Sequence, residues 1–400
     1  MAAERVALGD RSLFPELTAD AYLSYAAIAP VSARVARAVS DVVASYAKRG
    51  QVAFVEWAAQ RERLRGKLAS FLNADASELG LVTGTTCGIA DIALCMPWKA
   101  GDGVVLFEGE FPANITPWQR ASELFGLRLH WLSKPDPRGD EAELLAGLAS
   151  ALKTGVRLVA VSAVEFQTGL RLPLAKMAAL CHAHGAELCV DAIQACGVLP
   201  IDVKALDVDY LVGGAHKWLM GMEGAGFVYA KAERARLLEP RTAGWLSHED
   251  GVRFLWQGPG ELRYDRPIKS GIQFVEGSSS SVVGFAAMEA GLDPLIELGP
   301  TRIFPHVTAY LDELEKGLVG RGVVSHRARE RERQSGILTI TPPDGLRALD
   351  VVTALRKRGV FATQPEGLVR FAPHFPNAID EVPRVLAAFD ESIAEVRSAG

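Results

Sequence analysis

Short apolar runs alternate along the first half of the chain with stretches in which apolar residues recur every three to four positions. The runs are rich in Val, Leu and Ile, as in strands buried on both faces, and the intervening spacing is typical of amphipathic helices. Strands are expected at 81–82, 104–107, 127–132, 158–164, 186–190 and 209–212, and helices at 89–96, 115–125, 141–152 and 174–184. Strands that alternate with helices predict an α/β fold with a mainly parallel sheet.

The pattern changes after residue 229, and this change predicts a second domain. Residues 240–280 are rich in Gly, Pro and aromatic residues and predict a long irregular segment that serves a site or an interface. Helices are then expected at 282–297, 307–318, 349–357 and near the C-terminus, with strands at 337–341 and 368–372. We expect a large domain at 16–282, with an N-terminal arm and helices at 32–46 and 55–72, and a small α+β domain at 283–400.

Composition and charge exclude several classes of function. The 400 residues are 49% hydrophobic and 23% charged, and a net charge of −5 gives no basic surface for nucleic acid. No apolar run reaches the roughly 18 residues that span a membrane, and residues 1–5 lead into no signal-peptide core. Five cysteines, an odd number, favour a cytoplasmic protein without disulfides. Cys181-His182-Ala183-His184 is interpreted as a helix end, so no metal is predicted.

Two charged residues follow buried runs at positions where an α/β sheet binds ligands. Asp191 ends the run at 186–190, and the run at 209–212 leads through two glycines to His216 and Lys217. Because ligands lie at the carboxyl edge of such sheets, the acid and the lysine are expected to converge there. Pyridoxal phosphate needs this pair, a lysine for a Schiff base and a carboxylate on its pyridine nitrogen. Lys217 is therefore the predicted covalent holder and acid/base catalyst, and Asp191 the partner of the ring.

A phosphate site is predicted just after the first expected strand. Gly84-Thr85-Thr86-Cys87-Gly88 opens the helix at 89–96 with small and hydroxyl-bearing residues. Small residues let backbone N–H groups approach an anion, the hydroxyls add donors, and the helix N-terminus adds partial positive charge. Taken alone, the same residues would also make an ordinary helix cap.

The stretch from Val161 to Tyr229 resembles the class V aminotransferase-fold enzymes, a group that includes cysteine desulfurases, kynureninases and isopenicillin N epimerase-like proteins. The resemblance extends from Tyr22 to Arg370 and rests on Glu165-Phe166-Gln167-Thr168-Gly169, Asp191-Ala192-Ile193-Gln194, Ala215-His216-Lys217 and Gly224-Ala225-Gly226-Phe227. It implies the type I fold of pyridoxal-phosphate enzymes, a free α-amino acid as substrate, and a homodimer whose sites are completed across the interface.

The resemblance also implies roles residue by residue. For the cofactor, Thr85, Thr86 and His216 bind the phosphate, Phe111 stacks on the ring, Gln194 donates to the phenolic oxygen, and Ser278, within the serine run 278–281, reaches the partner's phosphate. For the substrate, Arg370 binds the α-carboxylate, and Ala27, Phe166 and Trp245 line the pocket. The structural alternatives are core packing for Phe111, an exposed helix position for Gln194, an edge strand for Arg370 and a flexible linker for the serines.

The reaction is less specified than the cofactor. The leading hypothesis is Cα-carbanion chemistry by a lyase that cleaves a C–S or C–C bond. An aminotransferase or an epimerase is the alternative, and a catalytically idle binding protein of this fold is the rival from another class. A persulfide-forming cysteine desulfurase is not expected, because residues 361–369 contain no cysteine and Phe111 stands where desulfurases carry histidine. All five cysteines precede Lys217, and Cys87 is expected to pack or to cap a helix.

Overall fold

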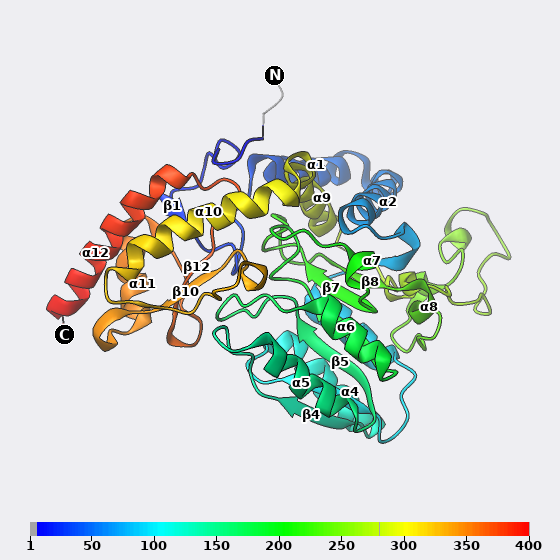
Figure 1. Cartoon of the computed structure of the whole chain (residues 1–400). Coiled ribbons are helices and arrows are strands. Elements are labelled where there is room, and N and C mark those ends of the chain that lie inside the picture. The colour runs from blue at the N-terminus through cyan, green and yellow to red at the C-terminus, as the bar shows by residue number, and fades with distance from the viewer. Residues whose placement is uncertain (1–5, 280, 400) are drawn as a thin grey trace.

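Figure 1 shows the chain as a computed structural model that describes residues 6–279 and 281–399. Its centre is a sheet of seven strands in the order β2-β8-β7-β6-β5-β3-β4. Within this sheet β8 alone runs antiparallel to its neighbours, so the predicted mainly parallel α/β sheet is confirmed. The strands are β2 (Leu79–Val82), β3 (Gly103–Phe107), β4 (Arg128–Leu132), β5 (Val156–Ser162), β6 (Glu187–Asp191), β7 (Tyr210–Gly214) and β8 (Gly226–Ala230).

Alternate residues of the central strands enter two apolar cores, one on each face of the sheet. In β6, Leu188 and Val190 belong to one core and Cys189 to the other. Because both faces are covered, these strands are apolar throughout, which is why the sequence pattern detects them. The helices between the strands are α3 (Thr85–Cys95), α4 (Thr116–Phe125), α5 (Glu141–Leu152), α6 (Leu174–Ala183), α7 (Val203–Leu206) and α8 (Ala232–Ala235).

Three helices from distant parts of the chain pack together above the main sheet (Figure 1). They are α1 (Ala33–Arg49), α2 (Ala53–Leu72) and α9 (Val282–Leu298). Ser32 starts α1 as a helix cap, since its side chain accepts a hydrogen bond from the Val35 N–H at 3.2 Å. Gln60 of α2 donates to the carbonyl of Phe285 in α9 at 3.1 Å.

The C-terminal third forms a second, smaller sheet of three antiparallel strands, covered by helices. Helix α10 begins at Pro300 rather than at the expected residue 307. Proline is tolerated in a first turn, and the hydrogen bond lost at Pro305 is offset by a buried apolar face. The elements are β9 (Val324–Ser325), β10 (Leu338–Thr341), β12 (Val369–Phe371), α10 (Pro300–Val319), α11 (Ala348–Lys357) and α12 (Val382–Ala399).

The N-terminal arm joins this smaller part of the molecule. Its strand β1 (Ala21–Tyr22) pairs in parallel with β11 (Val360–Phe361), and the Tyr25 N–H donates to the Ala372 carbonyl at 3.1 Å. The arm thus leads the chain from the C-terminal sheet into the large domain. The division of the chain at residue 282 stays a prediction.

The segment between α8 and α9 is irregular, as expected, and part of it extends away from the body (Figure 1). Among its described residues, three short 3-10 turns occur, at Trp245–Ser247, Arg253–Leu255 and Ile272–Val275. It exposes several large apolar side chains, Trp245, Phe254, Leu255, Trp256, Leu262 and Tyr264. Ser280 of the serine run lies outside the described residues.

The sequence predicts neither a membrane-spanning helix nor a metal site, and the structure bears on both expectations. Across the described part of the chain, no helix is long and apolar enough to cross a membrane. In the same residues, no group of three His, Cys, Asp or Glu side chains is arranged to hold a metal ion. His182 instead contacts Asp207 at 3.1 Å and Asp209 at 2.8 Å, and Cys181 is buried in the core. Residues 1–5, which carry the expectation about a signal peptide, are not described.

Candidate active site

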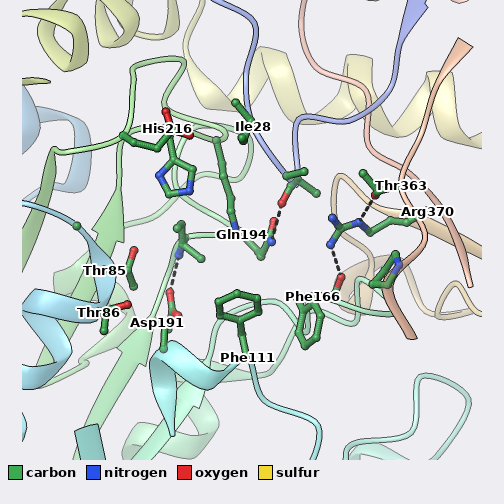
Figure 2. A pocket seen from close by; sticks show the side chains of 18 of the residues that line it. Ile28, Thr85, Thr86, Phe111, Phe166, Asp191, Gln194, His216, Thr363 and Arg370 are labelled. Atoms are coloured by element: carbon green, nitrogen blue, oxygen red, sulfur yellow. Dashed lines mark hydrogen bonds between the residues drawn. The ribbon is translucent and has the colours of Figure 1, made fainter. Parts of the chain in front are cut away.

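A cavity of about 820 Å³ lies where the carboxyl ends of β6 and β7 approach β12. Figure 2 shows Thr85, Thr86 and His216 on one side of it and Thr363 and Arg370 on the other, with Phe111 and Phe166 between. We call these the threonine end (Thr85, Thr86, His216) and the arginine end (Thr363, Arg370). Ten predicted site residues line the cavity: Ala27, Thr85, Thr86, Phe111, Phe166, Asp191, Gln194, His216, Lys217 and Arg370.

Asp191 and Lys217 are buried charged groups at the carboxyl edge of the main sheet. Asp191 is the last residue of β6 and pairs in register with Ser162 of β5. It is 2% exposed, and its Oδ1 accepts a hydrogen bond from the Ile193 N–H at 2.9 Å. Burial raises the pKa of Asp191 to about 6, against the opposing effects of that N–H and of Lys217.

Lys217 follows β7 and is 9% exposed. Burial lowers the pKa of its amine to about 8; Asp191 opposes this shift and Arg370 adds to it. The amine lies 5.5 Å from the centroid of the Phe111 ring. Such a lysine reaches its neutral, nucleophilic form at a lower pH than an ordinary lysine does.

The threonine end is a polar recess at the start of a helix. Helix α3 begins at Thr85, whose hydroxyl is buried and has no hydrogen-bond partner among the described residues. A Cβ at Gly214 would come within 2.9 Å of that hydroxyl and 3.5 Å of the His216 ring, so the missing side chain keeps the recess open. Burial lowers the pKa of His216, and Lys217 lowers it further. An unpaired buried hydroxyl beside a helix N-terminus fits an anion.

Gln194 lies in a turn after β6 and is 3% exposed, so the exposed-helix alternative does not apply. Its Nε2 donates to the Ala26 carbonyl at 3.0 Å, which ties the N-terminal arm to the cavity (Figure 2). Its Oε1 accepts from the Trp218 indole N–H at 2.8 Å.

Phe111 and Phe166 form the wall between the two ends. Their rings meet edge to face, with centroids 5.4 Å apart and planes at 84°. Phe111 is 46% exposed and lines the cavity, so it is not a core residue. Ile28 is also exposed and lines the cavity, so the cavity has three apolar side chains in its lining between the two ends.

Arg370 is the charged group of the arginine end. It is 5% exposed, its Nε donates to the Thr363 hydroxyl at 3.0 Å, and its Nη1 donates to the Phe166 carbonyl at 2.7 Å (Figure 2). No acid among the described residues forms an ion pair with it. Burial lowers its pKa to about 10, and Glu165 opposes this shift from a distance. The remaining guanidinium N–H groups are available to an anionic ligand.

Two predicted residues do not line the cavity of their own chain. Trp245 packs against Phe254, with ring centroids 6.3 Å apart, in the segment before α9. Ser278 lies in the same segment and is likewise absent from the cavity wall. Cys87 does line the cavity and is exposed, so it is not packed in the core; its sulfur accepts from the Thr83 hydroxyl at 3.1 Å at the start of α3.

Several residues of the cavity were not predicted from the sequence. Thr363, Gln364 and Pro365 line the arginine end, and Glu223 and Gly224 line the cavity beside His216. Thr363 and Gln364 lie a few positions before Arg370, in the segment 361–369 that contains no cysteine. The pairing of Thr363 with Arg370 across an isolated bridge brings that segment into the site.

The chain matches the aminotransferase class-V family model over residues 21–368, and it belongs to that family. The family is one of pyridoxal-phosphate-dependent enzymes. Isopenicillin N epimerase of Streptomyces clavuligerus is 26% identical over 338 residues, covering 83% of this chain and 84% of the relative. A cysteine desulfurase of Dickeya dadantii (strain 3937) is 33% identical over 256 residues, covering 61% of this chain and 57% of the relative.

The fold is shared with solved structures over nearly the whole chain. A C-DES mutant with glycine covalently linked to its pyridoxal phosphate superposes with a TM-score of 0.85 at 23% identity. The match covers 95% of this chain and 98% of the other. The type I fold implied by the sequence resemblance is thereby confirmed.

Proposed function

We propose that this protein binds pyridoxal phosphate covalently through Lys217 and acts on a free α-amino acid. The residues fit the cofactor: the recess at Thr85 suits its phosphate, Asp191 suits its pyridine nitrogen, and the Lys217 amine suits its aldehyde. Phe111 is exposed toward the same space for stacking. When bound, pyridoxal phosphate supplies an electron sink for a carbanion at the substrate Cα.

The burial of Arg370 without an acidic partner is the observation that supports an α-amino acid as the substrate. Arg370 is 5% exposed and has no acidic partner in the described chain. Burying an unpaired guanidinium costs free energy, unless a bound anion pairs with it. Its two fixed hydrogen bonds leave N–H groups for a carboxylate, the planar anion that arginine binds best. An α-carboxylate held at the arginine end directs the rest of an amino acid toward Lys217.

Different side chains of the cavity have different roles around the reacting carbon. Lys217, with a pKa lowered to about 8, can take and return a proton at Cα near neutral pH. Asp191 is the group expected to hold the ring nitrogen protonated. Phe111, Phe166 and Ile28 exclude water from the middle of the cavity and favour a substrate side chain without charge.

Among reactions of this class we favour a lyase that cleaves a C–S or C–C bond, with transamination and epimerisation as alternatives. A catalytically idle binding protein has no need for an amine with a lowered pKa next to an unpaired arginine. Persulfide formation is not favoured, because residues 361–369 lack a cysteine and four of the five thiols are buried. The remaining thiol, Cys87, lies by the threonine end, away from Arg370.

We also propose that the active unit is a homodimer in which Ser278 reaches the partner's phosphate. The segment is anchored, in contrast to a flexible linker. Glu276, 6% exposed, accepts from Arg61 at 2.9 Å, from Arg65 and from the Leu81 N–H at 2.8 Å. Ser278 is thus held next to a rigid point, and the exposed apolar side chains of residues 245–264 offer surface for a second copy.

The proposal is tested with purified protein reconstituted with pyridoxal phosphate and offered cysteine, kynurenine, aspartate and alanine derivatives. We expect a yellow protein whose absorbance changes with amino acids that carry a neutral side chain, and product formation that identifies the bond cleaved. A protein that binds no pyridoxal phosphate, or one that ignores every amino acid, would refute it.

A further inference from the structure

Trp218, the residue after Lys217, lies at the junction of the main sheet, the cavity and the small sheet. It is fully buried, and its indole N–H donates to Gln194 Oε1 at 2.8 Å. Its carbonyl accepts from His374 Nε2 at 2.9 Å. One tryptophan thus connects a cavity residue of the large domain with a residue that follows β12.

The packing around Trp218 permits little movement. A Cβ at Gly197 would come within 2.0 Å of the Trp218 carbonyl oxygen, and a Cβ at Gly336 within 2.8 Å of the indole ring. The backbone of the large domain and that of the small domain therefore both approach the tryptophan more closely than any side chain would allow. His374 contacts its ring as well, with centroids 5.6 Å apart.

The protonation of His374 is also fixed by its partners. Its Nδ1 accepts from the Phe375 N–H at 2.7 Å, so its Nε2 carries the proton that is donated to Trp218. Neutral His374 thus holds the backbone of Trp218 in place.

The indole determines how the Gln194 amide is turned. An indole N–H can only donate, so the amide must present its oxygen to Trp218 and its nitrogen to the opposite side. One N–H of that nitrogen goes to the Ala26 carbonyl, and the second is used by no described residue. Gln194 lines the cavity, so the second N–H is left for a ligand there. With the amide reversed, an oxygen would replace this donor, and the Trp218 and Ala26 groups would both be left without a partner.

We infer that Trp218 is a positioning residue, which fixes the Gln194 amide so that the cofactor meets a hydrogen-bond donor and not an acceptor. This inference rests on the proposed function, because it supposes that pyridoxal phosphate occupies the cavity. It concerns the phenolic oxygen of the cofactor, whose negative charge favours a donor.

The test is a double-mutant cycle on cofactor binding. Trp218→Phe keeps most of the apolar volume and removes the N–H, Gln194→Ala removes the amide, and the third variant carries both changes. We expect Trp218→Phe to raise the dissociation constant for pyridoxal phosphate about tenfold, as loss of one charge-assisted hydrogen bond predicts. The absorption maximum of the bound cofactor should shift as well. In the Gln194→Ala background the same change should have an effect of less than about twofold.

Trp98→Phe is the matched control, since the Trp98 indole N–H donates to the Ala93 carbonyl at 2.7 Å, away from the cavity wall. It should leave the dissociation constant and the spectrum unchanged. An effect of Trp218→Phe that is equally large in both backgrounds, or no effect in either, would overturn the inference. Failure of every variant and of the unmodified protein to bind the cofactor would instead refute the proposed function.

A second measurement decides the matter if Trp218→Phe does not fold. With ¹⁵N-tryptophan labelling, Gln194→Ala should move one indole N–H resonance and speed its hydrogen exchange, while the other tryptophans stay in place. An unchanged indole spectrum would show that Trp218 does not donate to Gln194.

Discussion

The threonine end and the arginine end of the cavity are held in different ways. At the threonine end each group follows directly on a strand of the main sheet: α3 starts soon after β2, and His216 follows β7. At the arginine end, β12 has three residues, and Arg370 is fixed by bonds to Thr363 and to the carbonyl of Phe166, which lies 204 positions earlier in the chain.

This difference separates a part of the cavity that the main sheet positions from a part that contacts between short segments position. The groups of the threonine end follow strands β2 and β7 of the main sheet. The arginine end depends on contacts between short segments, and a change in residues 363–365 alters the space for the substrate without disturbing the sheet.

The largest effect is expected from removing the lysine that serves both ends. Lys217→Ala should abolish the borohydride-fixed label and lower kcat by on the order of 10³-fold, because the covalent attachment and the proton carrier are lost together. Mass spectrometry of the reduced protein checks the label. Lys134→Ala removes a lysine outside the cavity wall and should leave the label intact. A label of the same size in Lys217→Ala would disprove the assignment.

The next effect distinguishes the two ends. Arg370→Lys should raise KM about 10- to 100-fold, because the guanidinium fork is lost, while the absorption spectrum of the bound cofactor stays the same. Arg333→Lys is a suitable control, since Arg333 is 5% exposed, lies outside the cavity, and donates to the backbone carbonyls of Gly139 and, at 3.2 Å, of Asp136. A change of the cofactor spectrum in Arg370→Lys would contradict the separation of the ends.

The sequence predicts the threonine end better than the arginine end for the same reason. The groups at the carboxyl edge of the sheet are detected because each ends or closely follows a buried strand: Thr85 follows β2, Asp191 ends β6, and His216 and Lys217 follow β7. Strand order then brings them together. Strand β8 (Gly226–Ala230) is not among the strands expected from the pattern, although all five of its residues are buried. Thr363 and Gln364 are not predicted from the sequence, because only the tertiary pairing of Thr363 with Arg370 makes this segment part of the cavity.

Trp218 illustrates a further limit of sequence reasoning. It follows Lys217 in the chain and is fully buried, and the sequence around it predicts no role for it. Its hydrogen bond to Gln194 and its contact with His374 join segments that lie 24 and 156 positions away in the chain, and no local pattern contains these contacts.

A moderate effect is expected for the pH dependence of cofactor capture. Because burial lowers the pKa of Lys217 to about 8, its neutral amine becomes populated as pH rises through 8, rather than through the usual 10.5. The rate at which apoprotein takes up pyridoxal phosphate should therefore rise about tenfold from pH 7 to 9 and level off above. Stopped-flow absorbance measures it. A rate that keeps rising steeply to pH 10.5 would show an ordinary lysine.

The smallest effect is expected for Ser278, which does not line the cavity of its own chain. Ser278→Ala should weaken cofactor binding about fivefold, the value of one neutral hydrogen bond to phosphate, with kcat nearly unchanged. Ser247→Ala would be a poor control, since that hydroxyl is buried and bonded to the Phe274 carbonyl. Ser70→Ala, on the exposed face of α2, is suitable because its hydroxyl only contacts its own helix.

Mixing experiments then show which chain supplies the serine. In a mixed dimer of a Lys217→Ala chain and a Ser278→Ala chain, a serine donated across the interface gives one native site, which combines Lys217 of one chain with Ser278 of the other. A serine that acts within its own chain gives no native site, and the mixture then binds the cofactor no more tightly than Ser278→Ala alone. Light scattering provides the second criterion, because a fully active monomer is incompatible with a site completed by a neighbour. A mixture without a native site, or a fully active monomer, would show that one chain completes the threonine end by itself.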